Sequence, residues 1–119
     1  MPTPVDPFVT RLITMLTPLG PIETRFMFGG TGLYLDGHHF AIAYGGRVYF
    51  RVDAATAAAF KEGGGQPFRY RRDGKPVTVV GYQEPPADSL KDGTSLLPWA
   101  KRGIEAARRV SVTKPERLQ

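Results

Sequence analysis

Residues 27–53 constrain the fold more than any other stretch, because two tight turns divide them into three short runs of strand-forming residues. The strands are expected at residues 33–35, 40–44 and 48–52, with turns at Asp36-Gly37 and Gly45-Gly46. Asp-Gly and Gly-Gly suit two-residue hairpin turns because their central residues adopt positive φ, where glycine has no Cβ to clash. Turns of this kind between β-branched and aromatic runs predict an antiparallel meander.

Elements on both sides of the meander predict a two-layer α+β domain. A first helix is expected from Asp6, a good N-cap, with Pro7 in its first turn and apolar residues at steps of three and four up to Leu19. The other elements are a strand at 22–28, a short helix at 54–62, a hairpin formed by 68–71 and 77–82 around Asp73-Gly74, and a last helix at 94–110. The prediction is therefore an N-terminal helix, an antiparallel meander sheet and a C-terminal helix, with one short helix after the central meander.

The ends of this domain follow from composition and spacing. Residues 1–110 are expected to form one domain, and residues 111–119, which contain few apolar side chains, a disordered tail. Pro98 is expected in the first turn of the last helix, where its missing N–H costs least. Glu105 and Arg109 are spaced to form an ion pair along that helix.

The basic side chains gather in two clusters. The net charge of the chain is +5, and residues 96–119 contribute +4 of it. The last helix carries Lys101, Arg102, Arg108 and Arg109, and the third hairpin carries Arg69, Arg71, Arg72 and Lys75. On one continuous surface the two clusters would suit a polyanion such as DNA. Separately, each is what a solvated face looks like, and this is the favoured interpretation.

Several kinds of catalytic and metal site are excluded or unsupported. The chain has no cysteine, which excludes disulfides, thiolate metal sites and a cysteine nucleophile. His38 and His39 are adjacent in a strand, so their side chains point to opposite faces and cannot share one metal. The glycines at 29, 30 and 32 precede a strand, whereas phosphate-binding glycine loops open a helix. We therefore expect no enzyme activity, no cofactor and no metal, although a pocket near these glycines lined by Tyr34, either histidine and Tyr49 would favour a ligand site.

Targeting signals are also missing from the sequence. The first residues lack the basic start and apolar core of a signal peptide, and no apolar run approaches the ~18 residues that span a bilayer. These observations predict a cytoplasmic protein without a membrane segment.

A series of short motifs resembles a known family. In chain order they are Arg25-Phe26-Met27-Phe28-Gly29-Gly30, Gly32-Leu33-Tyr34, Phe40-Ala41, Tyr49-Phe50-Arg51-Val52-Asp53, Pro67-Phe68 with Tyr70, Gly74-Lys75-Pro76 and Leu97-Pro98-Trp99-Ala100. The series resembles the TfoX N-terminal domain family of bacterial competence regulators and spans about residues 10–108. The resemblance implies a helix, an antiparallel sheet of about five strands and a closing helix. It also implies a transcriptional co-regulator of DNA-uptake genes that works with a cyclic-AMP-dependent activator, with no catalytic residues.

Longer family members continue into a second, C-terminal helical domain, so this chain resembles the N-terminal domain standing alone. We therefore expect a non-enzymatic regulatory module that acts through a protein partner, either transcription machinery or an activator. Exposed strand edges would seat that partner or a second copy of the chain, as a homodimer. Direct binding of nucleic acid through the two basic clusters is the alternative.

Overall fold

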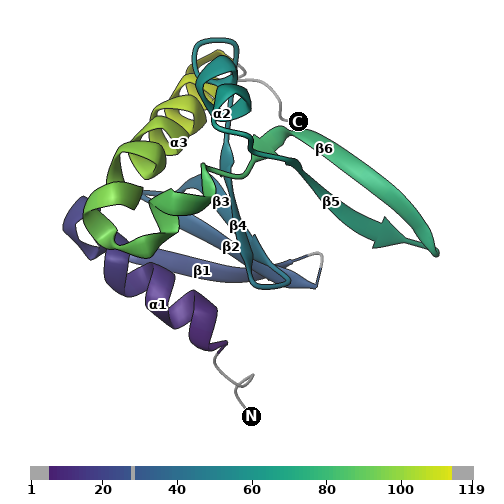
Figure 1. Ribbon diagram of the computed structural model, residues 1–119, viewed down its shortest axis with the longest axis horizontal. Helices are drawn as coiled ribbons and strands as arrows, with labels where there is room; N and C mark the ends of the chain where they lie inside the picture. Colours follow the sequence, from purple (N-terminus) through teal and green to yellow (C-terminus); the bar gives the residue numbers. More distant parts are fainter. Residues whose placement is uncertain (1–5, 28, 114–119) are drawn as a thin grey trace.

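The computed structural model of the chain describes residues 6–27 and 29–113, with side chains up to Arg109 (Figure 1). The helices are α1 (Pro7–Leu16), α2 (Ala57–Glu62) and α3 (Gly93–Thr113), with single 3-10 turns η1 (Thr17–Leu19) and η2 (Ala87–Lys91). The strands are β1 (Ile22–Met27), β2 (Gly30–Leu35), β3 (His38–Tyr44), β4 (Arg47–Arg51), β5 (Pro67–Arg72) and β6 (Lys75–Gln83). Phe28, which the first strand was expected to include, and residues 114–119 of the expected tail lie outside the described residues.

The six strands form one antiparallel sheet in the order β1-β2-β3-β4-β6-β5. The predicted α+β class is confirmed, with six strands where the family resemblance implied about five, because both strands of the last hairpin join the sheet. The three predicted turns are confirmed by positive φ at both central residues: Asp36 and Gly37, Gly45 and Gly46, and Asp73 and Gly74. β1 and β5 are the two edge strands.

The helices cover one face of the sheet and enclose the main core (Figure 1). Phe40 and Phe50 from the sheet and Phe60 from α2 are fully buried there, with Leu12 from α1 and Leu96 from α3. Gly103 lets α3 approach the sheet closely, since a Cβ at this position would lie 3.1 Å from the Phe40 carbonyl oxygen. The helical layer is thus fixed against β3 and β4.

A bulge at Phe40 changes which face of the sheet each residue of β3 occupies. Leu33 pairs with Ala41 and Tyr34 pairs with His39, so Phe40 is an extra residue opposite the β2 strand. Because of it, Phe40 and the following alanine both face the helices, and the alternation is displaced by one residue beyond them. Ile42 then packs in a second cluster on the face without helices.

The β5–β6 hairpin covers part of that helix-free face. Phe68 is fully buried, with ring centroids 5.1 Å from Tyr49 and 5.4 Å from Tyr44. β6 joins β4 at two register positions, Phe50–Gln83 and Arg51–Tyr82. Beyond these positions the hairpin projects away from the rest of the molecule (Figure 1).

One expectation about α3 is wrong. The helix begins at Gly93, so Pro98 is its sixth residue and lies beyond the first turn. The start is stabilised by Asp92, whose Oδ1 accepts a hydrogen bond of 2.8 Å from the Ser95 N–H. Pro98 has no N–H to donate to the carbonyl of Thr94, and both residues are exposed.

Candidate interaction surfaces

The edge strand β1 is the most exposed strand of the sheet. Among the described residues it pairs with β2 on one side, and its other edge is open. Its four central residues are exposed, and the Phe26 side chain retains 73% of its accessible surface. An open edge with a large apolar side chain is a template for pairing with another strand.

A groove lies between α1 and the strands next to this edge. It has a volume of about 430 Å³ and is lined by Val9 and Ile13 of α1 and by Thr24 and Phe26 of β1. Gly30 lies at its base, where a Cβ would come within 2.4 Å of the Ala43 carbonyl oxygen. The glycine-rich stretch therefore shapes a groove by close backbone approach.

On the opposite face, next to β1, aromatic rings pack against one another. Tyr34 stacks on His39 at 4.7 Å, and the Tyr82 hydroxyl lies 2.9 Å from His39 Nδ1. Arg51 donates a 2.6 Å hydrogen bond to the same hydroxyl. Gly32 adjoins these rings, and a Cβ there would lie 3.0 Å from His39 Nε2. The rings fill the space where a ligand pocket was considered, and Tyr49 is buried elsewhere, against Phe68.

This packing keeps His39 neutral at physiological pH. Burial, and to a smaller extent the positive charge of Arg51, lower the pKa of His39 from its ordinary 6.5 to about 4. The Tyr82 hydroxyl accepts from Arg51 and shares a hydrogen bond with Nδ1, in which the imidazole tautomer decides which of the two atoms donates. Nε2 is buried without a hydrogen-bond partner in the described part of the chain.

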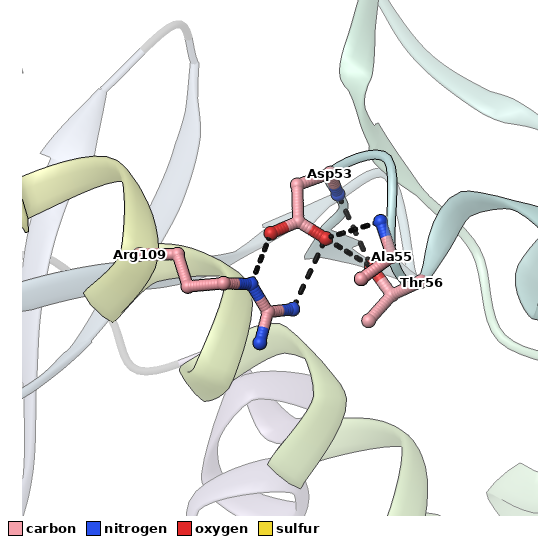
Figure 2. Close-up of polar contacts among 4 residues, drawn as sticks. All are labelled: Asp53, Ala55, Thr56 and Arg109. Atoms are coloured by element: carbon pink, nitrogen blue, oxygen red, sulfur yellow. Dashed lines mark hydrogen bonds and ion pairs between the residues drawn. The ribbon is translucent and has the colours of Figure 1, made fainter. Parts of the chain in front are cut away.

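The basic residues of α3 are largely held by contacts within the protein. Figure 2 shows Arg109, whose Nε and Nη2 donate to Asp53 over 2.5 and 3.1 Å. Arg108 lies 3.6 Å from Asp36, and the guanidinium of Arg102 lies 4.6 Å from the centre of the Trp99 ring. The sequence suggested Glu105 as the partner of Arg109, whereas the hydrogen bonds go to Asp53. The remaining predicted residue of this cluster, Lys101, is exposed.

Asp53 joins three elements through one carboxylate (Figure 2). Besides binding Arg109 of α3, its Oδ1 accepts hydrogen bonds from the Ala55 N–H and the Thr56 hydroxyl in the turn before α2. The pKa of Asp53 lies below its ordinary value, chiefly because of the hydrogen bond from Arg109. The Asp53–Arg109 pair is therefore a structural contact between the end of β4 and α3.

The basic residues of the hairpin form a separate surface. Arg69, Arg71, Arg72 and Lys75 are exposed at the outer half of β5–β6. Arg71 also donates to the carbonyl oxygen of Gly74 over 2.8 Å, which stabilises the turn. Figure 1 shows this tip and α3 at opposite sides of the molecule, so the structure does not join the two predicted clusters into one surface.

Residues 6–27 and 29–113 contain neither a metal-ligating cluster nor a membrane-spanning helix. No group of three or more acidic or histidine side chains there could hold a metal ion. None of the helices in this range has the length and apolarity to cross a membrane.

Residues 14–107, from within α1 to near the end of the described side chains, match the TfoX N-terminal domain family. The chain belongs to this family. The TfoX N-terminal domain described here is also similar to the DNA transformation protein TfoX1 of Aliivibrio fischeri, with 29% identity over 98 residues. That match covers 82% of this chain and 46% of TfoX1, so the chain spans about half the length of the curated relative. The family resemblance inferred from the motifs is confirmed.

The sequence interpretation did not identify the β1 edge and its groove. Alternation along the predicted strand at 22–28 puts Thr24 and Phe26 on one face, and in the structure both line the groove. Alternation does not say whether a helix covers that face. The available signal was that β1 is the first strand of a meander, which tends to place it at an edge.

Proposed function

We propose that this TfoX N-terminal domain is a cytoplasmic, non-enzymatic regulatory module that binds an extended protein segment along β1. The observation that carries the proposal is the open edge of β1, with Phe26 exposed beside a groove of about 430 Å³. Strand addition at such an edge draws affinity from main-chain hydrogen bonds and specificity from pockets for alternate side chains. Here the groove would receive the side chains that lie beside Phe26.

The regulated process follows from family membership. The TfoX relative is named a DNA transformation protein, and we propose that this domain acts in the control of DNA uptake, as a transcriptional co-regulator. Its partner at β1 would be a protein: transcription machinery, an activator or a second copy of the chain.

The test replaces Phe26 with Glu in the native gene and measures DNA-uptake transcripts and transformation frequency in the host. A hot-spot side chain carries roughly 2 kcal/mol of binding, which corresponds to about 30-fold in affinity, so a large loss of output is expected. Val80→Glu is the matched control, because Val80 is 70% exposed but lies on β6. Both proteins should accumulate and melt like the wild type. Equal output from wild type and Phe26→Glu would reject the β1 edge as the regulatory surface.

A second candidate, direct binding of nucleic acid, is supported by the projecting hairpin, whose residues 69–75 carry a net charge of +3. Its test is a salt-dependent titration with random duplex DNA. A variant with Gln at Arg69, Arg71, Arg72 and Lys75 is compared with one carrying Gln at Lys101, Arg102, Arg108 and Arg109. Loss of binding and a shallower salt slope in the hairpin variant alone would support the hairpin as the contact. No binding at low salt would reject this candidate.

A further inference from the structure

We propose that β1 pairs with β1 of a second copy of this chain, antiparallel about a two-fold axis at Thr24. The inference rests on the proposed function in one respect, that the β1 edge is the interaction surface, and it names the partner at that surface. It comes from the order of side chains along the strand, Ile22-Glu23-Thr24-Arg25-Phe26, which is complementary to itself when reversed.

The register follows from symmetry. In an antiparallel pair related by a two-fold axis at Thr24, Glu23 lies opposite Arg25 of the second copy, and the same pair occurs again on the other side of the axis. Ile22 likewise lies opposite Phe26 of the second copy, twice. Opposite charges and aromatic–aliphatic pairs at directly opposed positions are the favourable cross-strand combinations.

The two kinds of pair also fall on the correct faces. Thr24 and Phe26 line the groove beside α1, so the Ile22–Phe26 pairs would extend the apolar surface under the helices. Arg25 is on the opposite face, where its guanidinium lies 5.1 Å from the centre of the Tyr34 ring. This contact fixes the charge near the strand before a partner arrives.

Other registers and the other edge are unfavourable. Moving the axis from Thr24 to Arg25 or to Glu23 places like charges directly opposite each other, which is destabilising. At the β5 edge, two copies related by a two-fold axis can pair five residues of each strand in two registers. Both registers place one arginine opposite another. Like charges along an edge are a common protection against pairing. The sheet thus has one edge that accepts a copy of itself and one that repels it.

The first test reverses the charges. Arg25→Glu and Glu23→Arg should each weaken self-association at least about tenfold, as measured by sedimentation velocity, because each places like charges opposite one another. An equimolar mixture of the two variants should form a heterodimer, since every opposed pair is then complementary. Wild-type protein that stays monomeric up to about 1 mM, or a mixture that stays monomeric, would overturn the inference.

The second test checks the register by disulfide cross-linking between two copies. Thr24→Cys places one thiol on the axis, and because the chain has no cysteine, that thiol can only bond between two copies. Opposed Cα atoms in an antiparallel pair lie roughly 4.5–5.5 Å apart, within the range of a disulfide. Oxidation, which removes two electrons and two protons from the two thiols, should give a covalent dimer of Thr24→Cys but not of Thr78→Cys, at an exposed site on β6. Equal cross-linking of both variants would overturn the register.

The two proposals fail in different ways. If the protein is monomeric and Phe26→Glu still abolishes regulatory output, the edge binds a different protein, and the inference fails while the proposed function stands. If the Thr24→Cys dimer forms but Phe26→Glu leaves output unchanged, the dimer stands and the proposed function fails.

Discussion

Acidification is expected to destabilise this domain through the partly buried imidazole of His39. Burial and the charge of Arg51 lower the pKa of His39 from 6.5 to about 4 in the folded state. Between these two values the unfolded chain binds a proton that the folded chain does not bind. The stability that comes from a neutral His39 is therefore complete above pH 6.5 and is lost as the pH falls toward 4.

The size of the effect follows from the same difference in pKa. A shift of about 2.5 units at 1.36 kcal/mol per unit sets a ceiling of roughly 3.4 kcal/mol, of which about 2 kcal/mol would be lost by pH 5. The His39 side chain is partly exposed, so solvent screening reduces these values. We expect a loss of about 1 kcal/mol between pH 7 and pH 5, which corresponds to a fall in Tm of roughly 3–5 °C.

The assay is thermal unfolding followed by circular dichroism at several pH values from 7 to 5, a range above the ordinary pKa of Asp and Glu. His39→Gln should unfold with a Tm that changes less with pH, because an amide cannot take up a proton. The same pH dependence in wild type and His39→Gln would refute the assignment to His39.

Three further substitutions test particular contacts, each by urea unfolding. Gly30→Ala should lower the free energy of unfolding by about 2 kcal/mol, because its Cβ would meet a carbonyl oxygen of β3 at 2.4 Å. Gly81→Ala, with open space around it, should be near neutral, and equal effects of the two substitutions would contradict the close approach. Trp99→Ala should cost about 2 kcal/mol, since the ring is partly buried and packs edge-on against a ring of α2, with the ring centres 4.9 Å apart. A cost below about 0.5 kcal/mol would place the indole outside the packed layer. Asp53→Asn should cost about 1 kcal/mol through weakened capping and the lost ion pair with Arg109, and the loss should shrink in high salt; a cost that is independent of salt would contradict the ionic part.

Much of the fold follows from local sequence chemistry. Asp36-Gly37, Gly45-Gly46 and Asp73-Gly74 each require positive φ at adjacent residues, and this requirement alone places three hairpins in the chain. Periodicity then assigned the flanking strands and the helices to within a few residues. These features depend on neighbours along the chain, which is why the sequence predicts them.

The remaining features depend on contacts between distant segments. The bulge at Phe40 is set by the register between β2 and β3, and strict alternation along one strand cannot reveal it. Arg109 donates hydrogen bonds to Asp53, 56 residues earlier, while the nearby Glu105 adds a charge attraction. Pro98 was expected in the first turn of a helix starting at residue 94, whereas α3 starts at Gly93, which makes Pro98 its sixth residue. The exposure of Phe26 depends on the position of α1 over the sheet.

The short junction between β4 and β6 has a consequence for how the domain opens. The β5–β6 hairpin is paired along its own length but meets β4 at two register positions, with one more bond from the Val52 N–H to the Gly81 carbonyl oxygen. Losing these bonds together with the packing of Phe68 against Tyr49 and the hydrogen bond from Arg51 to Tyr82 would release the hairpin as one cooperative unit, below the free energy of global unfolding. Its amide protons should then exchange with solvent together, at a rate faster than those of β2 and β3. During each opening Ile42 and Tyr49 would be exposed to water while the helical layer stays folded.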